Sequence, residues 1–330
     1  MLTKTWSTKS DFEAGTLNNV LVPEGTNRLE LKRKALSGTA TYIVFGAQDW
    51  NHPHNRVMNW QGFEYSKENT KTILRDDFRE NSLGEYYQEG VDSAYPGFTA
   101  PTYDSANKRV NFDTGDNKGF TLRPKNLSVQ NFIMAFDFLG QVIYPQVFLI
   151  HAIGRWVNQS NMYSALVSRP IHGWYGSPAI YKLVNGVSTS LVGGVTPFSL
   201  NTKYQMITTI NGNSLKVEIP DLAFKSTTDS QFPNAGAVKF GAFQGKGWLD
   251  NFLLEHYSLP SPPNCSVSFK FWPSKDGVNF GSEYTDIKLV PNALYIKVQA
   301  TLSRNSLASA MPVLNSMTLT YKLLVQPVFF

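Results

Sequence analysis

Alternating apolar and polar residues recur in short runs along the chain and predict β-strands. Tyr204 to Ile210 ends in a β-branched run, Asn211-Gly212 follows it, and Leu215 to Ile219 alternates again between apolar and polar residues. Asn-Gly is typical of tight hairpin turns, because both residues adopt positive φ readily. The pattern therefore predicts a β-hairpin with Asn211-Gly212 as its turn.

The middle of the chain, residues 73–258, holds the densest series of such runs. In Asn131–Phe138 and Gln146–His151 the apolar residues are nearly continuous, which is typical of strands covered on both faces. No helical period of useful length is evident, so we expect an all-β fold. Further strands are expected at Gly119–Leu122, Met162–Val167, Ala179–Val184 and Ser188–Val192.

The two ends of the chain carry strand patterns that are too sparse to form separate cores. In residues 1–72, strands are expected at Asp11-Phe12, Val20–Val22, Leu29–Lys32 and Thr41–Phe45. In residues 264–330, strands are expected at Ser266–Phe271, Ile287–Val290, Leu294–Leu302 and Val313–Leu324. We therefore predict one split β-sandwich platform built from both ends, with the domain of residues 73–258 inserted between them and the Pro-rich segment 259–263 as linker.

The composition agrees with a β-rich globular protein, since aromatic residues make up 13% of the 330 residues and charged residues only 17%. Cys265 is the only cysteine, which excludes an internal disulfide. No window approaches 18 consecutive apolar residues, so we expect no membrane insertion, and the net charge of +5 is too dispersed to indicate nucleic-acid binding. Because no apolar leader follows Met1, we expect assembly inside a cell unless a leader has been removed.

Two short motifs give the middle region a family resemblance. The predicted hairpin is followed by Trp248-Leu249-Asp250-Asn251-Phe252, and an Asp76-Asp77-Phe78 motif opens the region. Together they resemble the closing and opening strands of concanavalin A-like (laminin G-like) jelly rolls. The resemblance implies that fold for residues 73–258 and a structural Ca²⁺ held by Asp250 and Asp77. Alternatively, both carboxylates cap backbone N–H groups at strand ends.

A second resemblance joins the two ends of the chain. The pattern from Trp6 to Val20, together with that from Pro273 to Tyr321, is similar to virion structural proteins of tailed phages, in which such a sandwich carries an inserted carbohydrate-binding jelly roll. The resemblance implies a tail, baseplate or head-fibre component that is located in the virion. The expected partners of the protein are other virion proteins, further copies of the same chain and a host-surface polysaccharide. A secreted carbohydrate-binding adhesin remains the alternative.

The sequence favours a protein without catalytic activity. Glycoside hydrolases with this type of jelly roll carry paired carboxylates on one strand, typically as Glu-x-Asp-x-Glu, and the chain has no such triplet. Asp76 and Asp77 are adjacent, so they would point to opposite faces of a strand. A glycan-cleaving enzyme is the less favoured alternative.

A loop-rich segment from Gly154 to Tyr181 is the candidate for glycan binding. Aromatic rings there could stack on sugar rings, while amide, imidazole and guanidinium groups could bind the hydroxyls. The candidate residues are Trp156, Tyr163, His172, Trp174, Tyr175, Arg155 and Asn158. The competing interpretation is that Trp174 and Tyr175 close the open end of the sandwich.

Overall fold

The protein is all-β, as the computed structural model shows. It describes residues 1–23, 26–32, 35–45, 56–85, 87–90, 97–144, 147–170, 178–194, 196, 198–258 and 265–325. The chain divides into two compact units, one formed by residues 1–70 and 260–330 and the other by residues 71–259. The predicted class, a jelly roll inserted in a split sandwich, is confirmed. The predicted linker 259–263 lies outside the described residues.

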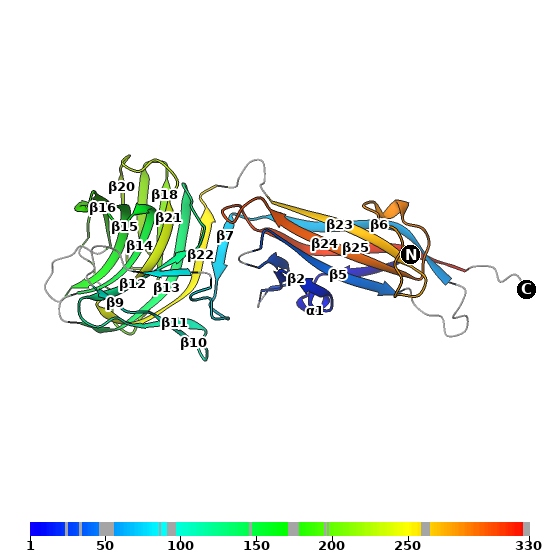
Figure 1. Ribbon diagram of the computed structural model, residues 1–330, viewed down its shortest axis with the longest axis horizontal. Coiled ribbons are helices and arrows are strands. Elements are labelled where there is room, and N and C mark those ends of the chain that lie inside the picture. Colours follow the sequence, from blue (N-terminus) through cyan, green and yellow to red (C-terminus); the bar gives the residue numbers. More distant parts are fainter. Residues whose placement is uncertain are drawn as a thin grey trace, which may run out of the picture. The chain divides into compact units, whose positions relative to one another are not determined.

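The first unit is a β-sandwich whose sheets both combine strands from the two chain ends. One sheet has the order β1 (Leu2–Trp6), β25 (Pro312–Val325), β4 (Leu29–Leu31) and β3 (Val20–Leu21), and β6 (Arg56–Asn69) also pairs with β25. The other has the order β2 (Thr16–Asn18), β5 (Ser37–Phe45), β24 (Tyr295–Arg304) and β23 (Cys265–Ser274). In Figure 1 the blue N-terminal strands accordingly lie beside orange and red C-terminal strands.

Strict alternation of burial explains how the two ends complete each other. Along β24, every second residue from Ile296 to Leu302 is fully buried, and β24 pairs with β5 over its whole length. The buried side chains of both ends share one core, in which Phe12, Leu29 and Trp6 lie with those of β24. Neither end could bury these apolar faces alone.

Two local expectations were wrong, and one strand was missed. Asp11-Phe12 belongs to a short helix, α1 (Lys9–Glu13), because the Thr8 hydroxyl accepts the Asp11 N–H and the Asp11 carboxylate accepts the Thr8 N–H, which is a capping box. Ile287–Leu289 forms a 3₁₀ turn, η1, rather than a strand. The long strand β6 was not expected at all.

The second unit is a jelly roll of two eight-stranded sheets, named here after their central strands. The β13 sheet contains β10 (Thr102–Asp104), β11 (Arg109–Asp113), β22 (Gly245–His256), β13 (Phe132–Ile143), β18 (Lys203–Asn211), β19 (Ser214–Ile219), β20 (Ala223–Thr228) and β7 (Thr72–Asp76). The β14 sheet contains β17 (Val187–Val192), β16 (Ala179–Val184), β15 (Asn161–Pro170), β14 (Val147–Asn158), β21 (Ala237–Phe243), β12 (Lys118–Pro124), β8 (Tyr87–Gly90) and β9 (Gly97–Phe98).

Aromatic side chains fill the space between these two sheets. Phe240 of β21 stacks on Phe252 of β22 with ring centroids 4.3 Å apart, and Phe148 of β14 meets Phe198 edge to face at 5.3 Å. Such contacts stabilise a core beyond simple area burial. The inward direction on each strand is therefore fixed, and alternate residues must point outward.

The predicted hairpin is formed by β18 and β19, with one correction. Gly212 has a φ of +56°, but Asn211 belongs to the strand and pairs with Ser214, so the turn consists of Gly212 and Asn213.

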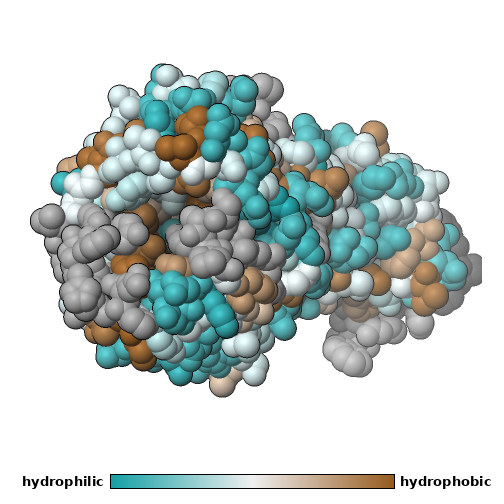
Figure 2. Space-filling model, turned by 60° about the vertical axis from the view of Figure 1, so that its left-hand side comes forward, coloured by the Kyte–Doolittle hydropathy of each residue, from teal (hydrophilic) through white to brown (hydrophobic). Residues whose placement is uncertain are grey.

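Among the described residues, no helix is long and apolar enough to cross a membrane. On the face shown in Figure 2, hydrophobic and hydrophilic surface alternate in small patches.

Candidate functional site

The outer face of the β14 sheet, which points away from the core between the two sheets, is the candidate site. A Cβ atom on Gly154 would meet Ile210 and Phe132 of the opposite sheet, so this position faces inward. Its neighbour Ile153 therefore faces outward, together with its register partners Lys239 on β21 and Ser164 on β15.

A β-bulge in β14 decides which of two adjacent side chains reaches this face. Ile153 pairs with Lys239 and Trp156 pairs with Ala237, so β14 has one residue more than β21 in this interval. Arg155 takes up the extra residue with a φ of +47°. As a result, Arg155 turns into the interior and Trp156 lies on the outer face.

Aromatic and hydroxyl groups lie side by side across this face. The register places Tyr181 of β16 beside Ser164, and Ser190 of β17 beside Tyr181. Trp156, Ser164 and Tyr181 are each half-buried, and Ser190 is exposed. Because neighbouring strands lie about 4.8 Å apart, the strands that carry Trp156 and Tyr181 are separated by roughly 10 Å.

Trp156 holds two cationic groups against its ring. The Nζ atom of Lys239 lies 4.1 Å from the ring centroid and the Cζ atom of Arg123 lies 4.8 Å from it. The indole also packs on an apolar cluster of Ile153, Met162 and Leu183. The quadrupole of an indole ring attracts cations at such distances, so Trp156 fixes both side chains on the outer face.

The strands of the β14 sheet carry almost no negative charge. Their only acidic residue is Glu89, whose register partner is Leu122. Their basic residues are Lys118, Arg123, Arg155, Arg169, Lys182 and Lys239. Among the described residues, Arg123 contacts only the amide oxygen of Gln88 and the ring of Trp156 in hydrogen bonds, ion pairs or cation–π interactions. Within the described part of the chain, Arg123 is therefore held on this face by an amide and an indole and not by a carboxylate.

Two of the residues expected to bind sugar lie in the interior instead. The Arg155 guanidinium is 1% exposed and donates hydrogen bonds to backbone carbonyls of Gln130, Phe232 and Gly212 at 2.6 to 3.1 Å. Tyr163 is 2% exposed and donates to Asp229 Oδ1 at 2.7 Å, and burial raises its pKa to about 12. Both side chains use their polar groups inside the fold, so the expected role in sugar binding does not fit their placement.

Apart from Trp156, the structure describes only Asn158 among the remaining expected sugar ligands. Asn158 is the last residue of β14, and its Oδ1 accepts the Ser160 N–H at 2.9 Å and an Asn161 N–H at 3.0 Å. His172, Trp174 and Tyr175 lie outside the described residues. Of the seven candidates, only Trp156 is placed on the outer face of the β14 sheet within the described part of the chain.

Of the two carboxylates expected at a calcium site, Asp250 lies on β22 of the β13 sheet and Asp77 follows the end of β7. Asp77 forms an ion pair with Arg79 at 2.8 Å, and Asp250 Oδ1 accepts the N–H of Asn251 at 2.7 Å. Burial, and then the charges of Asp137 and Asp77, raise the pKa of Asp250 to about 6, although the Asn251 hydrogen bond and Lys203 oppose this shift. Within the described ranges, no three Asp, Glu, His or Cys side chains cluster as a metal site. Calcium binding stays a prediction.

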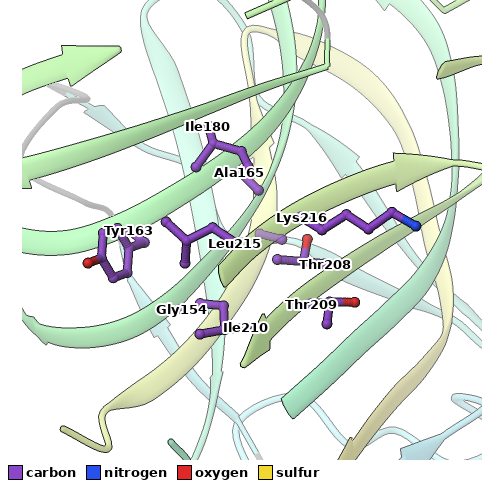
Figure 3. A pocket seen from close by; sticks show the side chains of 10 residues that line it. Gly154, Tyr163, Ala165, Ile180, Thr208, Thr209, Ile210, Leu215 and Lys216 are labelled. Atoms are coloured by element: carbon purple, nitrogen blue, oxygen red, sulfur yellow. The ribbon is translucent and has the colours of Figure 1, made fainter. Parts of the chain in front are cut away.

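Two cavities lie away from the outer face. One, of about 10 Å³, lies between the sheets and is bordered by Thr208, Leu215 and Ala165 (Figure 3), with room for roughly one water molecule. The other, of about 410 Å³, is in the sandwich unit and is bordered by Pro273, Asp276 and Asn292, among others. Of the residues predicted to bind sugar, Tyr163 borders the small cavity, and none borders the large one.

Arg123 and Lys239 were not among the expected site residues, because both lie outside the segment from Gly154 to Tyr181. The signal was present in the strands themselves. Arg123 follows the predicted strand Gly119–Leu122, and Lys239 interrupts an otherwise apolar strand. Only the order β14–β21–β12 brings these positions to Trp156.

Comparisons with known proteins add a likeness of fold. No family model and no curated protein matches the sequence. Similar solved structures include the CBM2 module of the evolved Dit of Lactobacillus casei BL23 phage J-1, with a TM-score of 0.43 and 12% identity over 58% of this chain and 97% of that one. Carbohydrate-binding module CBM66 from Bacillus subtilis gives 0.38 and 18%, over 47% and 91%. A Bacillus licheniformis β-glucanase gives 0.40 and 9%, over 56% and 98%.

These likenesses assign neither ligand nor activity to the chain. The jelly-roll part of the resemblance found in the sequence is confirmed by the fold of residues 71–259. Its laminin G-like and phage-tail parts stay predictions.

Proposed function

We propose that residues 71–259 form a glycan-binding unit whose ligand lies on the outer face of the β14 sheet. The observation that carries this proposal is the position of Trp156 and Tyr181, two half-buried aromatic residues on one rigid sheet face. Between and beside them lie hydrogen-bonding groups, namely the hydroxyls of Ser164 and Ser190 and the guanidinium of Arg123.

This combination suits a sugar better than a purely apolar ligand. Sugar rings present C–H groups on their faces, which pack on aromatic rings, and hydroxyls on their rims, which need donors and acceptors. Binding sites in general combine apolar and aromatic contact surface with a small number of fixed polar groups. The strands keep the aromatic residues in place, so little conformational entropy is lost when a ligand binds.

A glycan array with the full-length protein tests the proposal. We expect wild-type protein to bind at least one class of glycan and Trp156→Ala to lose that binding at least tenfold, because the indole supplies contact surface and holds both cations. Tyr181→Ala should weaken the same binding, since Tyr181 lies on the same face.

Trp248→Ala is the matched control. Trp248 lies on β22 of the other sheet and also has a cation, Arg109, over its ring at 5.2 Å. It should bind glycans as the wild type does, and thermal melts should show that all three variants are folded. Equal loss in the Trp156 and Trp248 variants, or no glycan binding by folded wild-type protein, would contradict the proposal.

We also propose that the unit binds glycans without cleaving them. Hydrolysis with retention or inversion needs two carboxyl groups flanking the scissile bond. The strands of the β14 sheet offer only Glu89. We expect no release of reducing ends from a polysaccharide panel, and turnover on any member of the panel would refute this part of the proposal.

For the whole chain, we propose a structural component of a virus particle, in the tail, baseplate or head fibre. The platform of residues 1–70 and 260–330 would bind neighbouring virion proteins or further copies of the chain. The support is the sequence pattern of the two ends, from Trp6 to Val20 and from Pro273 to Tyr321. Mass spectrometry of purified particles should detect the protein, whereas a secreted adhesin would be found free of particles.

A further inference from the structure

We infer that the platform carries a contact surface for a second copy of the chain, on the outer face of the sheet formed by β2, β5, β24 and β23. This inference rests on the role proposed for the platform, which includes binding further copies of the chain, and it is independent of glycan binding. The surface is called the apolar patch below. It consists of Ile43, Phe45, Tyr295, Lys297, Trp272 and Phe280.

The register of three neighbouring strands brings the patch together. On β5 and β24, Phe45 pairs with Tyr295 and Ile43 pairs with Lys297. On the other side of β24, Lys297 pairs with Trp272 of β23. These positions form two adjacent rows across the sheet, because residues two apart on a strand lie on the same face.

The patch points outward and is exposed. The neighbouring residues Tyr42, Val44 and Ile296 are at most 6% exposed, so they occupy the inner face. Ile43 and Phe45, in contrast, are 57% and 42% exposed. Two large apolar side chains are therefore presented side by side on β5.

The other half of the same face is polar, which shows that folding of this sheet does not require an apolar outer face. Its outward residues are Ser37, Thr39 and Thr41 on β5, Gln299, Thr301 and Ser303 on β24, and Ser266, Ser268 and Lys270 on β23. Single exposed apolar residues are ordinary on a protein surface, whereas contiguous ones indicate an interaction site.

A cation lies in the middle of the patch. Lys297 Nζ is 4.3 Å from the ring centroid of Trp272 and 4.9 Å from that of Phe280. Within the described part of the chain, Lys297 contacts these two rings and no carboxylate. Rings attract a cation without neutralising it, so Lys297 can still pair with a carboxylate of a partner.

A carboxylate lies at the edge of the same patch. Glu283 is next to Tyr284, whose backbone forms a bridge with Phe271 of β23. Its side chain is 43% exposed and pairs with Lys270 at 2.8 Å. Glu283 and Lys297 therefore lie on opposite sides of β23.

This arrangement makes the patch complementary to itself. A two-fold axis parallel to β23, between two facing patches, places the β24 side of each copy over the Glu283 side of the other. Lys297 of each copy then meets Glu283 of the other, and the contact occurs twice, as in any isologous interface. An axis perpendicular to the strands would instead bring the two Lys297 side chains together, and like charges repel each other.

The size of the face suits a reversible dimer. The strands β23 and β24 have ten residues each and β5 has nine. Three strands of this length cover roughly 33 Å by 14 Å. That area is smaller than the roughly 800 Å² that each partner contributes to a standard interface. We therefore expect dimers whose fraction rises with protein concentration.

Sedimentation of the full-length protein over a range of concentrations tests the inference. The mass should rise from the 37.0 kDa of one chain towards twice that value. Phe45→Ser should raise the dissociation constant at least tenfold, because it removes exposed apolar surface from the patch. Leu36→Ser is the matched control, since Leu36 is 48% exposed but precedes the polar end of β5, and it should change the constant less than about twofold.

Charge reversal tests the arrangement of the two copies. Lys297→Glu and Glu283→Lys should each weaken the dimer at least tenfold, because either change places like charges at both contacts. An equimolar mixture of the two variants should dimerise again, because both contacts of the mixed dimer then join opposite charges. Thermal melts check that every variant is folded.

The outcomes separate this inference from the proposed function. Protein that stays monomeric at every concentration, while it is found in particles or binds glycans, would overturn self-association alone. Equal effects of Phe45→Ser and Leu36→Ser would overturn the assignment to the patch. If the mixed variants did not dimerise, the two-fold contact between Lys297 and Glu283 would be wrong.

Discussion

The two sheets of the jelly roll have similar sizes but differ in the charged residues that their strands carry. Strands of the β13 sheet carry both signs, with Asp76, Asp104, Asp113, Asp137, Glu218, Asp250 and Glu255 beside Arg75, Arg109, Lys203, Lys216, Lys225 and Lys246. Strands of the β14 sheet carry basic residues and a single Glu89. One sheet is therefore nearly balanced and the other is strongly basic.

The pairing of these charges explains what the difference means. On the β13 sheet, the buried Asp137 pairs with Lys203 at 2.7 Å, and the exposed Asp113 pairs with Lys246 at 3.4 Å. On the β14 sheet, Arg123 is held by an indole and an amide. Lys182 of the same sheet pairs with Asp229 at 2.6 Å, so the contrast concerns Arg123 and not every cation of the sheet. A guanidinium held by an indole and an amide keeps its charge for a ligand, as a binding face requires.

The largest effect on stability should come from replacing Arg155, the neighbour of Trp156 that points into the core. Arg155→Met would leave the carbonyls of Gln130, Phe232 and Gly212 without their donors, and we expect the free energy of unfolding to fall by about 3 kcal/mol or more. Urea denaturation measures this. Arg123→Gln, on the outer face, should change it by less than about 0.5 kcal/mol.

These two arginines separate structure from binding on the same sheet. Arg155 should matter for stability, and Arg123 for ligand affinity. If Arg155→Met unfolded at the same urea concentration as the wild type, the interior hydrogen bonds described for Arg155 would not contribute, and the contrast between the two positions would be lost.

Much of the fold could be predicted because alternation is a local property. The pattern of β24, with Ile296, Val298 and Ala300 inside, can be read from sequence alone. Strand β6 was missed although Met58 to Gln61 alternate between apolar and polar residues, because the alternation shifts by one residue at Gly62, where the pairing with β25 is irregular. The helix α1 was missed because five residues are too few to show a helical period.

The candidate site was less predictable for two physical reasons. The bulge at Arg155 reverses the alternation, so the sequence could not indicate which of Arg155 and Trp156 points outward. Arg123 and Lys239 are far from Trp156 in sequence and meet it only through the order of strands in the sheet. Aromatic residues near a turn were therefore easy to select, and the cations were not.

A smaller, pH-dependent effect on stability is expected from replacing Asp250, which lies on the β13 sheet. Burial raises its folded-state pKa to about 6 from an ordinary value of 3.8, so the folded protein resists ionisation of this carboxyl group. The protonated Asp250 carboxyl group stabilises the folded state fully below about pH 4, and this stabilisation is lost as the pH rises through 6. Asp250→Asn should therefore stabilise the protein at pH 8 but not at pH 4.

The expected gain at pH 8 is on the order of 1 kcal/mol, because the side chain is half-exposed and solvent screens part of the shift. An asparagine Oδ1 can still accept the Asn251 N–H, so the local hydrogen bond is kept. Thermal melts of wild type and variant at the two pH values give the result. An equal difference in melting temperature at pH 4 and pH 8 would show that ionisation of Asp250 is not coupled to folding.

The smallest effect should follow from breaking an exposed ion pair on the β13 sheet. Lys216 and Glu218 are ion-paired, but their side chains are 39% and 35% exposed. Exposed pairs of this kind contribute little, so Glu218→Gln should change the free energy of unfolding by less than about 0.5 kcal/mol. It should also leave the affinity for any glycan that the protein binds unchanged, in contrast to Trp156→Ala. A tenfold change in that affinity would mean that the β13 sheet contributes to binding, and the assignment of the ligand to the β14 sheet alone would be wrong.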